Sequence, residues 1–307
     1  MTTKKQLTRK RKTPSKSIAS KSIASKSIAS KSIASKSIAV IGAGNLGSAI
    51  ARGIVRAGLR RAPEVLLTRR HPEELAELRA QGHPVGRDNA KFASAARIVI
   101  LAVQPKHTAR VLAELAPVLD PKRHILVSTL TGVSIEGLRR HVGSEVPVVR
   151  VMPNLGIQTL NSMTCLARDA PSEPAFSEVE ALFAGLGETV RIEEANMGAA
   201  TALCACGIAF FLRAIRAAAQ GGIQIGFHAE EAIRMAAQTA KGAAELLLVN
   251  RSHPETEIDQ VTTPNGCTIA GLNEMENHGF SSALVRGLVV SAQRAGALDP
   301  SRDRGGS

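Results

Sequence analysis

The sequence predicts an α/β fold, in which a doubly wound, mostly parallel sheet domain is followed by an all-α domain. Short apolar runs rich in β-branched residues alternate with helical segments as far as residue 192, the pattern of parallel strands joined by crossover helices. From Glu194 onward the strand signals stop and long helical segments follow. The length of 307 residues suits about two domains.

The expected elements follow in chain order. We expect strands at 37–41, 65–68, 97–103, 124–128, 148–152, 163–167 and 188–192. Helices are expected at 46–57, from 107, from 134 and at 176–186, and then at 195–220, 229–249, 255–262, 268–276 and 281–297. The domains are placed at 37–193 and 194–300, between tails at 1–36 and 301–307 that are expected to be disordered.

A glycine-rich turn follows the first strand and opens a helix. It reads Gly42-Ala43-Gly44-Asn45-Leu46-Gly47, which matches the pattern G-x-G-x-x-G. Gly42 permits the tight turn, Gly44 lets the backbone approach a pyrophosphate, and Gly47 lets the helix pack on the strand. The helix N-terminus then binds the phosphates. This context is typical of a dinucleotide-binding, Rossmann-type domain.

The residues after the second strand indicate which dinucleotide is bound. An Asp or Glu at this point would accept a ribose 2′-hydroxyl, but the sequence has Arg69 and Arg70. Because arginine pairs with a 2′-phosphate, we expect NADPH to be preferred, with NAD as the alternative cofactor. The structural alternative is that both are ordinary surface arginines of a loop.

The nicotinamide end of the cofactor is expected at the carboxyl ends of the strands, where open α/β sheets bind their ligands. The segments 102–105, 129–133 and 152–154 follow three such strand ends. We therefore expect them to form the rim that faces the nicotinamide.

The second domain is expected to dimerise. The predicted helix 195–220 is apolar on all sides, and a domain of about 110 residues does not cover such a helix. A homodimer through the helical domain is the natural remedy. Between two later helices, the segment 262–268 contains Pro264 and Gly266, and the next helix would offer free N–H groups to a small carboxylate. An ordinary inter-helix turn with a threonine cap is the equal alternative.

The composition excludes several functions. The chain has a net charge of +13, but residues 1–36 carry eleven Lys/Arg and no acid, which leaves +2 for the rest; no nucleic-acid-binding face is expected on the fold. Trp and Tyr are absent, so a tyrosine acid is excluded. Four cysteines without C-x-x-C and eight histidines without HExxH spacing predict neither a disulfide framework nor a metal site. A reducing, cytoplasmic location fits best.

Two further segments are interpreted from their composition. The longest uncharged run, 195–212, contains Asn196, Gly198 and Gly207, so we expect a buried or interface helix and no membrane span. Residues 16–40 form five pentads of the type KSIAS, whose period gives no apolar face, and we expect a disordered tail. A nucleic-acid, membrane-surface or transit-peptide role of this basic tail stays an alternative.

Six segments between about Ser37 and Ala297 are informative when taken together in order. They are IGAGNLGSAI (41–50), AVQP (102–105), STLTGVS (128–134), VRVMPN (149–154), HP (253–254) and VTTPNGCTIAGLNEMENHGF (261–280). On these segments the chain resembles the pyrroline-5-carboxylate reductase family. The resemblance implies reduction of the C=N bond of 1-pyrroline-5-carboxylate to L-proline with NAD(P)H in proline biosynthesis, by dimers that often assemble into larger rings. A protonated cyclic imine is already electrophilic, so hydride transfer needs positioning more than a strong acid.

The resemblance also assigns residues to the site. The pyrophosphate would be held by Gly42, Gly44, Asn45 and Leu46, with Gly47 behind them, and the adenosine phosphate by Arg69 and Arg70. The nicotinamide would be surrounded by Val103, Pro105, Thr131, Gly132 and Asn154. The substrate would be held by Thr263, Asn265, Gly266 and Thr268. Thr268 is the candidate catalytic residue, because its hydroxyl can hydrogen-bond the nitrogen that becomes the amine.

Three segments depart from the family pattern. Residues 205–209 read Ala-Cys-Gly-Ile-Ala for the usual Gly-Ser-Gly-Pro-Ala, 264–268 read Pro-Asn-Gly-Cys-Thr for Pro-Gly-Gly-Thr-Thr, and 155–157 read Leu-Gly-Ile for Thr-Pro-Ala. A reductase of a different cyclic imine and a non-catalytic dinucleotide-binding paralogue therefore stay open. A β-hydroxyacid dehydrogenase is set aside, because the helix 195–220 lacks the lysine that its chemistry needs.

Overall fold

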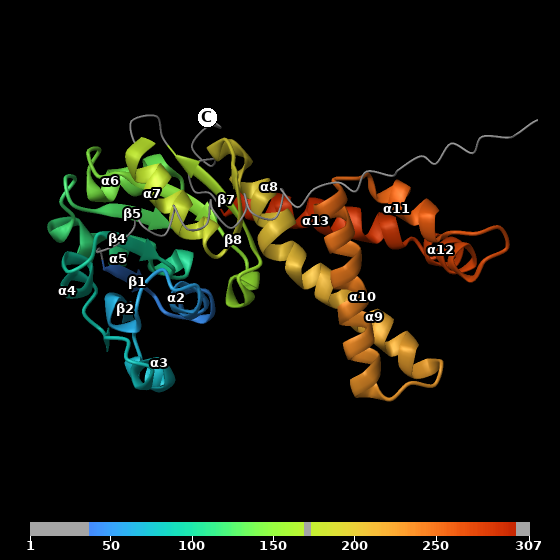
Figure 1. Cartoon of the computed structure of the whole chain (residues 1–307). Helices are drawn as coiled ribbons and strands as arrows, with labels where there is room; N and C mark the ends of the chain where they lie inside the picture. The colour runs from blue at the N-terminus through green and yellow to red at the C-terminus, as the bar shows by residue number, and fades with distance from the viewer. Residues whose placement is uncertain (1–36, 169–172, 299–307) are drawn as a thin grey trace, which may run out of the picture. The chain divides into compact units, whose positions relative to one another are not determined.

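The computed structural model of the chain describes residues 37–168 and 173–298. The two tails that we expected to be disordered lie outside the described residues. Within the described residues, a sheet domain is followed by helices alone, which confirms the predicted α/β class (Figure 1). The last strand ends at Arg191, and the first helical element begins at Glu194.

The described residues form one sheet of eight strands, in the order β3-β2-β1-β4-β5-β6-β7-β8. Strand β7 is antiparallel to β6 and every other neighbouring pair is parallel, so the sheet is mostly parallel, as predicted. The chain winds outward from β1 in both directions, which is the doubly wound arrangement. The strands are β1 (Ile38–Ile41), β2 (Val65–Thr68), β3 (Val85–Gly86), β4 (Ile98–Leu101), β5 (Ile125–Ser128), β6 (Val148–Met152), β7 (Ser162–Arg168) and β8 (Gly187–Arg191).

Helices cover both faces of the sheet, because the central strands are apolar at every position. Alternate residues of β1 enter different cores: Ile38 and Val40 pack in one cluster with α2 and α7, and Ala39 and Ile41 pack in the other with α4, α5 and α6. The bounds are α2 (Asn45–Arg56), α3 (Ala76–Ala80), α4 (Asn89–Ser94), α5 (Thr108–Leu115), α6 (Ile135–Val142) and α7 (Glu173–Ala184). The sequence did not predict β3, α3 or α4, which are two, five and six residues long and too short for a clear periodic pattern.

The second domain departs from the prediction in its first helix. A single helix was expected at 195–220, but residues Thr201–Cys206, near its start, form a π-helical turn. The Cys204 carbonyl in this turn accepts a hydrogen bond from the Asn154 side chain (3.1 Å). Such π turns occur often at functional sites. The elements are η7 (Glu194–Asn196), α8 (Met197–Ala200), the π turn η8 (Thr201–Cys206), α9 (Gly207–Gln224), α10 (Ala229–Asn250), α11 (Pro254–Val261), α12 (Cys267–Asn277) and α13 (Phe280–Ala297).

Of the two alternatives expected for this first helical segment, a buried or an interface helix, burial within the single chain is wrong. Helix α9 buries only Gly207 and Ala219, whereas Phe211 and Leu212 are 60% and 59% exposed. The expectation that no segment qualifies as a membrane span is also wrong by length and composition. In the described part of the chain, Glu194–Gln224 passes that test, with 22% of its most apolar window buried. An apolar helix that a single chain leaves uncovered passes the same test.

Candidate functional site

The glycine-rich turn joins the end of β1 to α2. Gly42 has φ +94°, and the N–H groups of Gly42 and Ala43 donate to the Thr68 carbonyl at the end of β2 (3.1 and 2.8 Å). A Cβ atom on Gly42 would lie 2.6 Å from Val103 Cγ1, and one on Gly47 would lie 2.5 Å from the Gly42 carbonyl oxygen. Close packing of the turn against the neighbouring strand end and of α2 against the turn therefore requires glycine at both positions.

Gly44 differs from these two glycines because the space beside it is open. No atom lies within 4 Å of the place where its Cβ would stand. Gly44 is the N-cap of α2, and the first turn of that helix has no side-chain cap and no acidic residue. The first N–H groups of a helix have no partner within it and carry partial positive charge. This open, acid-free N-terminus fits the pyrophosphate of a dinucleotide.

The two arginines after β2 have different surroundings. Arg69 forms an ion pair with Glu74 and donates to the Ala43 carbonyl (3.3 Å). Arg70 is exposed, and its Nη2 lies 3.1 Å from Nε2 of His107, which follows β4. Burial first, and then the charges of Arg70 and two neighbouring cations, lowers the pKa of His107. Two loops that both follow sheet strands thus meet in a basic cluster.

His107 was missed as a site residue by the sequence analysis. It stands 37 positions after Arg70, and only the return of β4 to the side of β1 brings the two loops together. The available signal was its position directly after the fourth predicted strand. Beside this region, a cavity of about 370 Å³ is lined by residues of the glycine-rich turn, of α2 and of the β2 loop, among them Gly44, Asn45, Ser48, Arg52, Arg69 and Glu74.

The structure places the predicted nicotinamide rim along one edge of the sheet. Val103 and Pro105 follow β4, Thr131 and Gly132 follow β5, and Asn154 follows β6, all after parallel strands. The strand ends are tied together by the hydrogen bonds from Ala102 N to Ile41 O (2.8 Å) and from Thr129 N to Leu101 O (3.1 Å). Asn154 is engaged at both ends of its amide: Oδ1 accepts from Gly156 N (2.9 Å) and Nδ2 donates to Cys204 O. Asn154 therefore holds the π turn of the second domain against the rim.

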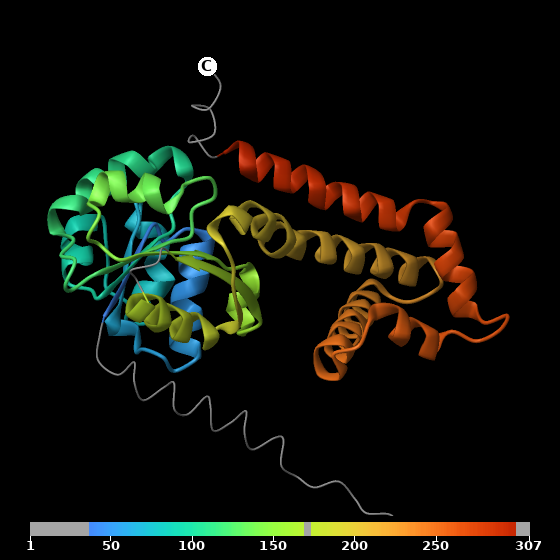
Figure 2. The ribbon, with the colours of Figure 1, turned by 90° about the horizontal axis from the view of Figure 1, so that it is seen from above.

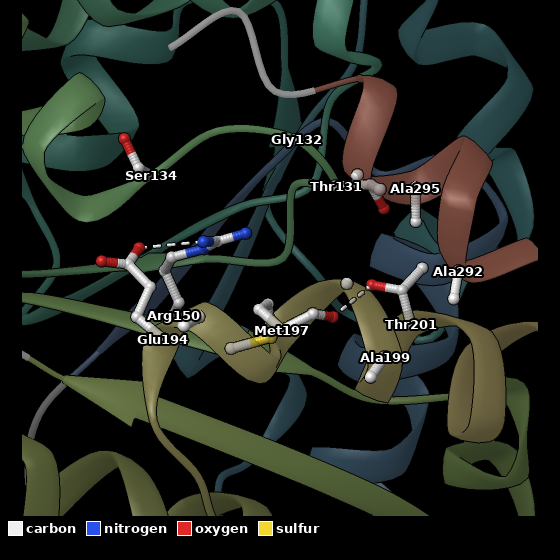
Figure 3. Close-up of a pocket in the computed structure, with 13 residues that line it drawn as sticks. Thr131, Gly132, Ser134, Arg150, Glu194, Met197, Ala199, Thr201, Ala292 and Ala295 are labelled. Atoms are coloured by element: carbon white, nitrogen blue, oxygen red, sulfur yellow. Dashed lines mark hydrogen bonds and ion pairs between the residues drawn. The ribbon is translucent and has the colours of Figure 1, made fainter. Parts of the chain in front are cut away.

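A second cavity, of about 330 Å³, opens where the rim meets the first helical turns (Figure 3). Arg150 of β6 lies at this cavity and is only 5% exposed. Its Nη1 pairs with Glu194 Oε1 (2.8 Å), and the same oxygen accepts from Ile135 N (2.7 Å). This pair joins a buried arginine to a glutamate side chain that is 32% exposed, and it fastens the helical domain to the sheet. The sequence analysis missed it, although an arginine within an otherwise apolar strand was a usable signal.

The predicted substrate loop lies between α11 and α12. The helix α12 begins at Cys267 with Gly266 as its N-cap, and its first turn has no side-chain cap and no acidic residue. Gly266 N donates to Thr263 O (2.9 Å), which closes the turn. The threonine cap of the alternative interpretation is therefore wrong, and the N-terminus of α12 is open.

Asn265 in this loop adopts a left-handed backbone with φ +57°. Glycine is the residue most at ease in this region, and asparagine is among the few others that tolerate it. Asn265 therefore keeps the backbone conformation that a glycine would have at this position. Its departure from the family pattern is compatible with an unchanged loop backbone.

The structure does not bring the two predicted halves of the site together within one chain. Both views show α11 and α12 at the end of the helical domain that is remote from the sheet (Figure 1, Figure 2). Thr263, Asn265 and Thr268 are exposed there. The residues predicted to bind the cofactor thus lie in the sheet domain, and those predicted to bind the substrate lie in the helical domain.

A doubly wound sheet with a glycine-rich turn and an open helix N-terminus, followed by a helical domain, defines a dinucleotide-dependent oxidoreductase of two domains. Two family models agree with this class. Residues 37–132 match the model described as NADP oxidoreductase coenzyme F420-dependent, and residues 194–298 match the model for pyrroline-5-carboxylate reductase dimerisation.

The chain belongs to the pyrroline-5-carboxylate reductase family. It is 48% identical over 276 residues to pyrroline-5-carboxylate reductase 1 of Dictyostelium discoideum, covering 84% of this chain but only 49% of that relative. It is 46% identical over 271 residues to pyrroline-5-carboxylate reductase 2 of the same organism, covering 83% of this chain and 90% of the relative.

Solved structures show the same fold. A pyrroline carboxylate reductase of Plasmodium falciparum with NADP bound superposes with a TM-score of 0.78 at 24% identity, over 86% of this chain and 98% of that one. A 1-pyrroline-5-carboxylate reductase of Streptococcus pyogenes superposes with a TM-score of 0.75 at 28% identity, over 85% and 98% of the two chains.

Proposed function

We propose that this chain reduces the C=N bond of 1-pyrroline-5-carboxylate to give L-proline, with NADPH as the preferred reductant. The observation that carries the proposal is the open, acid-free N-terminus of α2 at Gly44, in a chain that belongs to this reductase family. NADPH supplies the hydride for the imine carbon.

The cofactor half of the site has residues suited to each part of NADPH. The backbone at Gly44 and Asn45 would hold the pyrophosphate at the start of α2. Arg70 and His107 would hold the 2′-phosphate, whose negative charge would favour the protonated imidazole among the cations of this cluster. Arg69 contributes less to this contact because Glu74 already pairs with it.

The substrate half follows from the loop before α12. Its open N-terminus suits the carboxylate of the imino acid, and Thr268, in the first turn, has a hydroxyl that can hydrogen-bond the ring nitrogen. Because a protonated imine is already electrophilic, orientation of this nitrogen and exclusion of water are the tasks left to the protein.

A second copy of the chain would complete the site. The helical domain leaves large apolar side chains exposed, among them Phe211, Leu212, Leu248, Val249 and Val285. Burial of such a surface drives association, and the matching family model is one of dimerisation. In a homodimer, the loop between α11 and α12 of one chain would reach the nicotinamide rim of the other chain. We assign Glu194–Gln224 to this interface rather than to a membrane.

The first test is the rate of NADPH oxidation by the full chain with 1-pyrroline-5-carboxylate, compared with the rate of NADH oxidation. The second test is the rate of a mixture of two inactive variants. Arg70→Ala should raise the KM for NADPH and leave that for NADH little changed. An inactive Gly44→Val chain mixed with an inactive Thr268→Val chain should regain activity, since each mixed dimer holds one intact pair of halves. Absence of turnover by the wild-type chain, with NADPH still bound, would contradict the proposed reaction.

The alternative substrate, another cyclic imine, is favoured by Cys206 and by Leu155, which is 44% exposed near the rim. The left-handed backbone of Asn265 weakens this alternative, because the loop keeps a glycine-like conformation. Rates with five-membered and six-membered cyclic imino acids would decide between the two, and a higher kcat/KM for the six-membered ring would overturn the proposal.

A cytoplasmic location is proposed from the four cysteines, which are all free. Fluorescent fusions of the full chain and of residues 37–307 would test it. Entry of the full chain alone into an organelle would assign the basic tail a targeting role and contradict the proposed location.

A further inference from the structure

Two cysteines that the proposed reaction does not use lie side by side where the two domains meet. Cys165 is in β7 and is 5% exposed, and Cys204 is in the π turn η8 and is half-buried. Their Sγ atoms are 3.7 Å apart, although 39 positions separate them in the sequence. The separation is that of a thiol hydrogen bond, and a movement of the π turn toward β7 by less than about 2 Å would bring the sulfurs to bonding distance.

Both cysteines are close to the nicotinamide rim. In the pairing of β6 with β7, Cys165 lies opposite Met152. Met152 precedes Asn154 by two residues. The Cys204 carbonyl accepts the hydrogen bond from Asn154 Nδ2 (3.1 Å). Any change in the position of the π turn is therefore transmitted directly to Asn154 and to the loop that it caps.

The surroundings make one thiol a nucleophile and the other its partner. The hydrogen bond from Cys165 lowers the pKa of Cys204 to about 7, whereas the same bond and burial raise the pKa of Cys165. A thiol whose pKa is near the ambient pH reacts fastest in exchange and oxidation. Cys204 is also the more accessible of the two, so an oxidant reaches it first.

We propose that Cys165 and Cys204 form a reversible intramolecular disulfide when the protein meets hydrogen peroxide, and that this bond lowers its reductase activity by displacing the π turn from Asn154. The second half of this statement rests on the proposed function. The first half concerns covalent chemistry alone.

The chemistry balances with peroxide as the only oxidant. The Cys204 thiolate attacks one peroxide oxygen, the O–O bond breaks, and a sulfenic acid and hydroxide form. The Cys165 sulfur then attacks the Cys204 sulfur, the S–O bond breaks, and the S–S bond forms. The departing hydroxide takes the thiol proton as water. Two thiols are oxidised and one peroxide is reduced to two waters, and a dithiol reductant reverses the change.

The covalent part is tested by mass spectrometry of the full chain after peroxide treatment without reductant. We expect the loss of two of the four free thiols and a single cross-linked peptide pair that joins Cys165 to Cys204. Cys165→Ser and Cys204→Ser should each abolish this pair. Cys206→Ser, a matched control in the same π turn, should keep it. Stable sulfinic acid on Cys204, a pair that includes Cys206 or Cys267, or no thiol loss would each overturn the proposal.

The functional part is tested on the same samples. Oxidation should lower kcat by about tenfold or more through misplacement of Asn154, and dithiothreitol should restore it. Cys165→Ser should retain its own starting rate after peroxide. A disulfide that forms without a change in rate would overturn the effect on activity. A reduced protein that lacks reductase activity altogether would instead contradict the proposed function and leave the disulfide standing.

Discussion

The sheet domain and the helical domain bury their apolar side chains to very different extents. Every residue of β1, β4, β5 and β6 is buried. Among the described residues of the second domain, α9 buries two small residues, α10 and α13 bury one alanine each, and α11 and α12 bury none. The core of the sheet domain is thus closed within one chain, whereas the helical domain has its apolar surface outside. Folding of the first and association of the second are therefore separable properties.

The largest expected effect separates these properties with one type of substitution. Phe183, in α7, is fully buried, whereas Phe211, in α9, is 60% exposed. Phe183→Ala should lower the free energy of unfolding of the sheet domain by about 3–5 kcal/mol, because it removes apolar contacts and leaves a cavity. Phe211→Ala should leave the unfolding of a dissociated chain nearly unchanged and should weaken the proposed homodimer. Denaturant unfolding and light scattering at several protein concentrations measure both.

The outcome that would break this comparison is specific. If Phe211→Ala lowers the unfolding free energy as much as Phe183→Ala at a concentration where the chain is a monomer, the helical domain has a core of its own. Arg213→Ala, on an exposed residue of the same helix, is the matched control for general damage to α9. It should leave both unfolding and association unchanged.

The next effect concerns the junction between the two domains. Glu194→Gln removes the charge that pairs with Arg150, which is 7% exposed at its side chain. We expect a loss of about 2–4 kcal/mol, because a buried guanidinium then lacks its counter-charge. Glu136→Gln is the control, because the Glu136–Arg140 pair is exposed on both sides and should change stability by at most about 0.5 kcal/mol. Equal effects in the two variants, measured by denaturant unfolding, would show that the junction pair does not fasten the domains.

A smaller effect tests the cofactor half of the site without touching the core. Gly44→Ala places a methyl group where no protein atom stands within 4 Å, so the melting temperature should hold while the Kd for NADPH rises roughly thirtyfold, or about 2 kcal/mol. Gly242→Ala, equally open in α10, is the control and should leave the Kd unchanged. Unchanged NADPH affinity in Gly44→Ala, measured by titration calorimetry, would contradict the placement of the pyrophosphate at this helix N-terminus.

The sequence predicted the sheet domain better than the helical one, for a physical reason. The strands at 65–68 and 148–152 were predicted with the bounds that the structure has, because buried or nearly buried strands have short continuous apolar runs between turns. The glycine-rich turn was recognised equally well from the sequence. Gly42 and Gly47 are required by contacts within a few residues or with an adjacent strand.

The features that the sequence did not predict depend on contacts between distant segments. The π turn at 201–206 interrupts a segment that is helical by every local rule, and Asn154, some fifty positions earlier, bonds to its carbonyl. Arg70 meets His107, and Arg150 meets Glu194, only through the sheet order. The proximity of Cys165 to Cys204 has the same origin. No periodicity reports such pairs, because each member satisfies the local pattern of its own element.

The smallest expected effect is a pH dependence that belongs to the sheet domain alone. His124, at the start of β5, is 2% exposed, and its Nδ1 accepts from Asp120 N (2.8 Å). Burial lowers its pKa below the usual value of about 6.5. As the pH falls, the unfolded chain therefore binds a proton before the folded chain does, and the folded state loses stability below about pH 6.5. The loss is at most about 1.4 kcal/mol per pH unit, which is the limit for one titrating group. Above that pH this residue contributes no slope.

His124→Gln should flatten the unfolding free energy between about pH 6.5 and the lowered pKa, because the titrating group is gone. His141→Gln, on the exposed side of α6, is the control and should keep the wild-type slope. Association through the helical domain should change little over the same range, because His124 lies in the sheet domain. A dimer that dissociates in step with the loss of sheet stability would mean that the two domains do not behave independently, and the difference in burial between them would then have no thermodynamic counterpart.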